Sequence, residues 1–258
     1  MKAGPAARIV PPLAVFVAAI VAWDLLIRLA RIPSFLLPRP MEVLRSIVVD
    51  RLSLVESLGW TTLAAIIGFA ASAVIGMLIA LLLSTSALLR RAVYPYTLFF
   101  QTVPIIAIAP MLIFWFEPGV TPVAICAFIV SVFPVIANTL AGLRSTDPAL
   151  VDLFRLYGAG PISGLWKLRL PWALPGIFTG LRIAAGLAVI GTLVSEIFVG
   201  PIEDREGLGV KLYNASKQAR PDLTFAAVLL ASLLGLAMFG AVNLAAHLAL
   251  RRWHASEQ

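Results

Sequence analysis

Charged residues are scarce in this sequence. They make up 13% of the 258 residues, while 60% are hydrophobic and the mean hydropathy is +0.97. Soluble domains carry about a quarter charged residues, so this chain has too little polar surface to cover a globule in water. Since a membrane-spanning helix needs about 20 apolar residues, the composition predicts an all-α polytopic membrane protein with about six transmembrane helices. No separate soluble domain fits beside them.

The side chains that build catalytic and metal sites are scarce as well. Cys126 is the only cysteine and lies in an apolar run, which excludes an internal disulfide and a thiolate metal site. His247 and His254 lack metal-ligand spacing, and the clustered His, Asp or Glu of a membrane-embedded enzyme are absent, as are Walker motifs. We therefore expect no catalytic residue, no metal site and no cofactor in this chain. The net charge of +7 comes from dispersed basic residues, which does not indicate nucleic-acid binding.

Six apolar runs predict the membrane spans. They cover residues 9–30, 58–83, 93–116, 120–143, 174–199 and 223–250. A signal peptide is the alternative for the first run, but the run is long for one and no clean cleavage site precedes Asp24. We expect a retained span in which Asp24 and Arg28 pair across four residues. The third run carries Pro95, Pro104 and Pro110, which interrupt backbone hydrogen bonding.

Periodic patterns predict how some of these segments pack. A proline-rich turn over residues 33–40 precedes a stretch over 42–56 whose spacing suits an amphipathic helix at the membrane interface. In the second span, small residues recur every four positions and predict close helix packing: Ala64, Gly68, Ser72, Gly76 and Ala80. The fifth span has a comparable series that lines either a helix contact or a pathway: Gly176, Gly180, Ala184, Ala188 and Thr192. The spans show no internal repeat, so a two-fold transporter must pair two chains.

The distribution of charge predicts the orientation. With a cytoplasmic N-terminus, the inner side holds Lys2, Arg8, Arg90, Arg91, Arg144, Arg155, Lys167, Arg169, Arg251 and Arg252 against Asp147, Asp152 and Glu257. The outer side holds Arg31, Arg39, Arg45, Arg51, Arg205, Lys211, Lys217 and Arg220 against Glu42, Asp50, Glu56, Glu117, Glu203, Asp204, Glu206 and Asp222. The whole excess of +7 therefore lies inside, although Lys and Arg alone are biased by only ten to eight. This places residues 144–172 in the cytoplasm.

The polar stretch over residues 144–172 is the most informative part of the chain. Asp147 can cap a helix that Pro148 opens and Gly158 ends, so we expect a short helix over residues 149–157. A second helix is predicted over 162–170, with Pro171 stopping it. A short helix held between two spans can transmit force as a rigid lever. On periodicity alone, a plain amphipathic loop helix is the alternative.

The spacing in this stretch resembles the EAA loop of ABC-importer permeases. Asp152, Gly158, Leu168, Leu170 and Pro171 stand at the offsets of that loop, while Asp152 replaces its Glu and Leu153-Phe154 replace its alanine pair. In that family the loop forms a cytoplasmic coupling helix that docks on an ATPase subunit. The resemblance assigns this coupling role to Asp152, Leu153, Phe154, Leu156, Gly158, Leu168, Leu170 and Pro171.

From about Pro33 to the C-terminus, further segments resemble the nitrate/sulfonate/taurine-type permeases. These segments are residues 101–104, 109–110, 115–116, 133–134, 138–139, 141–144 and 170–182, and permeases for the pyrimidine precursor of thiamine are similar too. The resemblance implies a type I ABC importer permease fold in the bacterial cytoplasmic membrane. It implies a single transmembrane permease domain over 1–258, with an N-terminal helix and interfacial segment over 1–57 and core helices over 58–250.

The same resemblance implies the partners. In such importers two permeases form the pathway, here expected as a homodimer, and two ATPase subunits bind ATP and Mg. An external binding protein delivers a small solute, here a nitrate-, sulfonate- or taurine-like anion or a related small organic compound. Residues 200–222 would then meet that binding protein or serve as a solvated connector. An autonomous secondary transporter or channel is the alternative function.

Polar residues within the spans are the candidates for lining a pathway, with interhelical hydrogen bonding as the alternative. They are Gln101, Thr102, Ser131, Asn138, Thr139, Ser195 and Glu196. An ionisable residue in a span is a functional candidate, and the alternative for Glu196 is pairing with the charged outer loop. Arg182 lies closer to the inner end, where snorkelling to the headgroups is favoured over substrate contact.

Overall fold

The computed structural model describes residues 5–201 and 205–250, where all regular structure is helical. The elements are α1 (Pro5–Leu29), α2 (Pro40–Val49), α3 (Arg51–Thr85), α4 (Ala87–Thr102), α5 (Ile105–Trp115), α6 (Val120–Arg144), α7 (Pro148–Leu156), α8 (Pro161–Gly164), the π-helix η1 (Leu165–Arg169), α9 (Leu170–Val199), α10 (Leu208–Lys217) and α11 (Pro221–Leu250). Seven residues used above lie outside the described residues: Lys2, Glu203, Asp204, Arg251, Arg252, His254 and Glu257.

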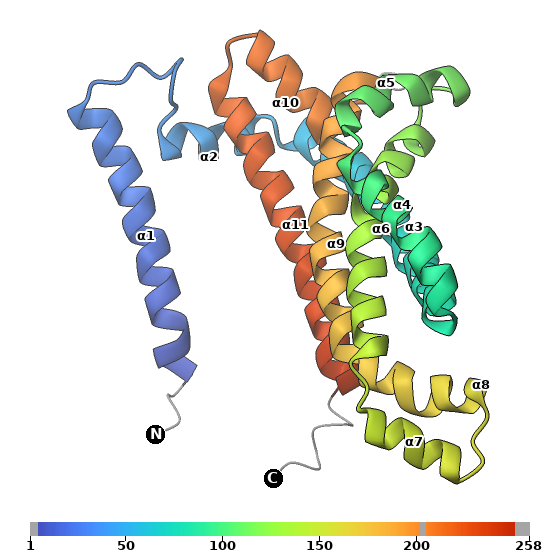
Figure 1. The fold of residues 1–258 in the computed structure, drawn as a ribbon. Helices are drawn as coiled ribbons and strands as arrows, with labels where there is room; N and C mark the ends of the chain where they lie inside the picture. Colours follow the sequence, from blue (N-terminus) through green and yellow to red (C-terminus); the bar gives the residue numbers. More distant parts are fainter. Residues whose placement is uncertain (1–4, 202–204, 251–258) are drawn as a thin grey trace.

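The long helices run alternately between two ends of the molecule (Figure 1). One end carries α7 and α8, the start of α1 and the last turn of α11, and we call it the α7 end. The opposite end carries α2, α5 and α10, and we call it the α10 end. Five described segments are long and apolar enough to cross a membrane, within α1, α3, α6, α8 to α9, and α11. The prediction of an all-α polytopic membrane protein is confirmed.

The third span, predicted over residues 93–116 with three prolines that interrupt it, forms as two helices in the structure. The chain returns from the α7 end as two helices, α4 and α5, broken at Val103 and Pro104. Both residues have extended backbone angles, with ψ of 124° and 113°. Pro104 has no N–H to donate, and its ring pushes Val103 out of the helical region. Pro95 and Pro110, by contrast, lie inside α4 and α5.

Helix α6 forms the centre of the bundle, because small residues let α3 and α9 approach it closely. A Cβ on Gly68 of α3 would stand 2.7 Å from the Ala124 carbonyl oxygen of α6. A Cβ on Gly180 of α9 would stand 2.7 Å from the Pro134 carbonyl oxygen. The predicted packing series of the second span is therefore confirmed, since all five of its members are buried. The series of the fifth span likewise serves a helix contact.

The interfacial helix predicted over residues 42–56 is divided in the structure. Helix α2 ends at Val49, and α3 begins at Arg51 and continues into the second span, which therefore starts before the predicted residue 58. At the Asp50 corner, the Arg220 guanidinium lies 2.8 Å from the Asp50 carboxylate and 3.5 Å from that of Asp222. The hydrogen bond to Asp50 raises the pKa of Arg220 above its ordinary value, so this guanidinium stays charged. The predicted Asp24–Arg28 pair is also present, at 2.7 Å.

The prediction that Pro171 stops a helix is wrong. Helix runs on from α8 through η1 into α9, so Pro171 stands in the first turn of a helix that reaches Val199. The Leu170 N–H donates to the Leu165 carbonyl, five residues back, which widens this turn. A proline ring clashes with the carbonyl four residues before it, and a π-turn at that place relieves the clash. The fifth span therefore begins before the predicted residue 174.

Candidate functional sites at the two ends of the bundle

Helix α7 forms where its local sequence predicts it. The Asp147 carboxylate accepts a hydrogen bond of 2.9 Å from the Ala149 N–H, and Pro148 stands at the first helical position. The helix ends at Leu156, and Gly158 adopts a φ of +74°, a left-handed conformation that favours glycine. The predicted cap, start and stop are confirmed. None of its residues is fully buried, so its caps contribute more to its stability than packing does.

The α7 end exposes large apolar side chains. Leu156 and Tyr157 are 85% and 84% exposed, and Ile162 and Trp166 on the following segment are also exposed. A cavity of about 400 Å³ lies between this segment and the end of α3, lined by Phe154 among others. Exposed apolar groups of this size at the end of a protein are typical of a protein interaction surface. We call residues 147–169 the α7 segment.

The predicted coupling residues divide into two groups in the α7 segment and the first turn of α9. Asp152, Leu153, Leu156 and Gly158 are exposed. The Asp152 carboxylate lies 3.3 Å from the Arg155 guanidinium one turn later. Phe154, Leu168, Leu170 and Pro171 are half-buried. The first group is open to a partner and the second supports the segment against the bundle, while their coupling role stays a prediction.

At the α10 end, Glu196 of α9 lies beneath the first turn of α10. Its side chain is 5% exposed. The Gly209 N–H donates to one carboxylate oxygen at 2.7 Å, and the Thr61 hydroxyl of α3 donates to the other at 2.8 Å. The Thr61 oxygen in turn accepts from the Leu208 N–H at 2.8 Å. Since the first N–H groups of a helix have no partner within it, Glu196 and Thr61 together cap α10 from two other helices.

Two glycines make this cap possible. A Cβ on Gly207 would overlap the Glu196 carboxylate, and a Cβ on Gly209 would overlap the Leu193 carbonyl of α9. The loop predicted over residues 200–222 is thus not only a connector, because α10 lies within it and packs on the bundle. The sequence analysis gave pairing with the charged outer loop as the alternative for Glu196, and the structure shows such a contact, made by the Gly209 N–H and not by a charged side chain. Nothing in the sequence distinguishes Thr61 from the other Ser and Thr residues of the predicted spans.

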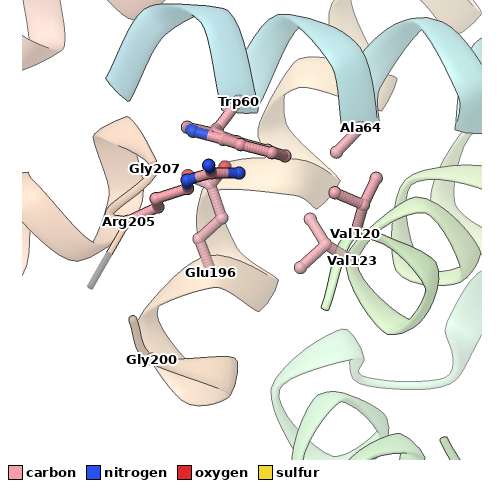
Figure 2. Close-up of a pocket in the computed structure, with 8 residues that line it drawn as sticks. All are labelled: Trp60, Ala64, Val120, Val123, Glu196, Gly200, Arg205 and Gly207. Carbon is pink, nitrogen blue, oxygen red and sulfur yellow. The ribbon is translucent and has the colours of Figure 1, made fainter. Parts of the chain in front are cut away.

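A small cavity of about 60 Å³ lies beside Glu196 (Figure 2). The Arg205 guanidinium carbon stands 4.9 Å from the centre of the Trp60 ring, a cation–π contact. Figure 2 shows Glu196 and Arg205 pointing toward Trp60, while Val120 and Val123 of α6 close the opposite side. The cavity holds little more than one or two water molecules, so in this conformation it is no solute site.

The other predicted pathway residues lie in different environments. Ser131 and Ser195 are fully buried, with their hydroxyls donating to the carbonyls of Ala127 and Thr192 at 2.6 and 2.9 Å. Thr139 is fully buried too, and its hydroxyl has no hydrogen-bond partner among the described residues. Asn138 is half-buried and donates to the Pro134 carbonyl at 2.9 Å.

Gln101 and Thr102 are exposed and stand at the break between α4 and α5. The structure therefore does not bring the seven candidates together. A pathway role for each of them stays a prediction.

Comparison with known proteins gives a consistent result. Residues 72–251 match the family model described as the binding-protein-dependent transport system inner membrane component. A probable ABC transporter permease protein of Haemophilus influenzae is 32% identical over 93% of this chain and 96% of its own length. The formylaminopyrimidine transport permease protein ThiX of Halalkalibacterium halodurans is 36% identical over 90% of this chain and 91% of its own. A putative aliphatic sulfonates transport permease protein of Bacillus subtilis is 26% identical over 84% and 78%.

Proposed function

Because this chain belongs to the family of binding-protein-dependent transport system inner membrane components, we propose that its α7 segment is the surface on which a separate ATPase subunit acts. The chain is the permease subunit of an ABC importer in the bacterial inner membrane. Within such an importer, the permease does not itself catalyse hydrolysis, and the proposed ATPase binds the ATP and Mg.

The observation that carries the proposal is the exposure of Leu156, the last residue of α7, and of Tyr157, which follows it. Apolar side chains at the end of the bundle gain by burial against a partner, at about 25 cal/mol per Å² of apolar area. The half-buried Phe154, Leu168 and Pro171 connect this surface to α9. Movement of the α7 segment would therefore shift the helix that packs along the centre of the bundle.

The solute pathway is proposed to lie between two copies of the chain. Small residues close the contacts between α3, α6 and α9, so the centre of one protomer is filled by its own backbones and side chains. A pathway on an outer face needs a second wall, and a homodimer supplies it. An external binding protein would deliver the solute at the α10 end, where α10 is held on the bundle through Glu196.

The solute is proposed to be a small molecule. The formylaminopyrimidine and sulfonate permeases to which this chain is similar suggest a pyrimidine precursor or a small organic anion. An autonomous secondary transporter is the competing function. The similarity extends over nine-tenths of the chain to permease subunits, which favours the importer.

Purification from native membranes tests the ATPase contact. We expect ATPase activity to co-purify with the wild-type chain and to fall at least about tenfold in Leu156→Asp, because a charge there costs more than 1.4 kcal/mol of apolar contact. Leu88→Asp is the matched control, since Leu88 is 79% exposed at the start of α4, near the same end.

Equal loss in both variants would contradict the assignment of the surface. Solute transport by the isolated chain in liposomes, without ATPase, would support the competing function instead.

A further inference from the structure

We infer that a cavity between α9 and α11, at the α7 end, binds the phosphodiester headgroup of an acidic membrane lipid. The cavity measures about 660 Å³ and is lined by Arg182 of α9 and by Asn243, His247 and Leu250 of α11. The inference depends on the fold and on the chain's place in a membrane. It uses the proposed function only to assign the site to the cytoplasmic leaflet.

Arg182 is the charged residue among those that line this cavity, and the described residues offer it no ion-pair partner. Its Nε atom is buried without a hydrogen bond, and no ion pair joins it to a carboxylate in the part of the chain that the structure describes. None of the lining residues is acidic. A guanidinium in a membrane span is costly unless an anion or water meets it, so this group favours a negatively charged ligand.

The direction of the Arg182 side chain fits a ligand at headgroup level. Side chains tilt toward the N-terminus of their helix, and the N-terminus of α9 is at the α7 end. Helix α9 has 30 residues and is about 45 Å long, which exceeds the roughly 30 Å of the hydrocarbon layer. Its first turns therefore extend beyond the hydrocarbon. A long side chain from Arg182 can snorkel back to that boundary.

Helix α11 supplies neutral donors and space. Asn243 and His247 are four residues apart and so lie on one face, from which an amide N–H and an imidazole N–H can donate to phosphate oxygens. Gly240 also lines the cavity, and a Cβ there would meet nothing within 4 Å. The glycine leaves the cavity wide enough for a headgroup.

Apolar groups around the cavity favour a lipid over a free phosphate. Leu244 lines it and is 60% exposed, and Leu248 beside it is exposed as well. These side chains offer a surface for acyl chains, which a soluble anion does not have. Basic pockets between transmembrane helices at this level are typical sites for acidic lipid headgroups.

Native mass spectrometry of the complex purified in detergent tests the site. We expect bound phosphatidylglycerol to exceed bound phosphatidylcholine at equal added concentrations. One Arg near the membrane surface contributes about 1 kcal/mol to the binding of an anionic lipid, which is about a fivefold preference over a zwitterionic one. Arg182→Gln should therefore lower phosphatidylglycerol occupancy about fivefold. Arg182→Lys, which keeps the charge, should retain most of it. Arg91→Gln, at an exposed Arg of α4 near the same end, should leave occupancy unchanged.

Three results would overturn the inference. The first is equal binding of the two lipids, and the second is an equal effect of Arg182→Gln and Arg91→Gln on occupancy. The third is displacement of the lipid by inorganic phosphate at matched concentration, which would identify a site for a soluble anion. The measurement needs no ATPase activity. If Leu156→Asp left ATPase co-purification intact while lipid selectivity followed Arg182, the proposed function would fail and this inference would stand.

Discussion

At the scale of single residues, Glu196 illustrates how a charge in a span can serve structure. Its carboxylate accepts hydrogen bonds from Gly209 and Thr61, and both contacts hold α10 against the bundle. An anion at a helix N-terminus is favoured by the unpaired N–H groups and the helix dipole. A functional role for the carboxylate would therefore act through the position of α10, at the face where an external binding protein is proposed to deliver the solute.

The first prediction concerns Glu196→Gln. The amide keeps the size of the side chain, but it presents one N–H₂ group toward donors that need an acceptor. A buried donor left without an acceptor costs about 1–3 kcal/mol, so we expect unfolding in detergent to become easier by about that amount. Glu56→Gln, at an exposed carboxylate of α3, is the control and should change little. Equal stability of the two variants would show that the cap contributes nothing.

The second prediction concerns Gly209→Ala. The added methyl would overlap the Leu193 carbonyl and press on Glu196, so α10 must move. Overpacking of this kind costs about 1–3 kcal/mol. We expect a lower thermal midpoint in detergent and faster proteolysis within residues 205–220. Gly235→Ala on α11 has open space around the new methyl and should be neutral or slightly stabilising.

At the scale of elements, local sequence determines the bounds of α7 but does not determine where a proline breaks a helix. The start and end of α7 follow from Asp147, Pro148 and Gly158, because caps act within one turn and need no tertiary partner. Pro104 and Pro171 are the same residue type with opposite outcomes. At Pro104 the backbone turns out of the helix, whereas at Pro171 a π-turn absorbs the clash. Which outcome occurs depends on neighbours that the local sequence does not identify.

The third prediction concerns the N-cap of α7. Asp147→Ala removes an acceptor for the first turn and costs about 1 kcal/mol, which corresponds to about fivefold more frequent opening. Since no residue of α7 is fully buried, packing compensates little, and amide hydrogen exchange over residues 149–156 should rise by about that factor. Asp152→Ala removes only an exposed pair with Arg155 and should have a much smaller effect.

At the scale of the whole molecule, the alternating helices place the predicted inner and outer segments at opposite ends. Among the described residues, the α7 end carries basic residues that are predicted to be cytoplasmic, including Arg144, Arg155 and Lys167. The broken third span does not disturb this alternation, since α4 and α5 together return the chain to the α10 end. The charge distribution and the fold therefore give the same topology.

The fourth prediction tests this orientation by cysteine labelling. Lys217→Cys on α10 should react with a membrane-impermeant maleimide in intact spheroplasts, and Leu156→Cys on α7 should react only after permeabilisation. The native Cys126 is buried and provides an unlabelled background. Labelling of Leu156→Cys in intact spheroplasts would place α7 outside and contradict its contact with a cytoplasmic ATPase.

The sequence by itself determined the membrane class, most of the spans and the bounds of α7. These features depend on hydropathy over about 20 residues or on caps within one turn, and both are readable along the chain. Only the tertiary structure decided the partners of Glu196, the unpaired position of Arg182 and the continuation of α9 through Pro171. Each of these requires knowing which distant helix lies opposite. Thr61 and Glu196 are 135 residues apart, and no local pattern couples them.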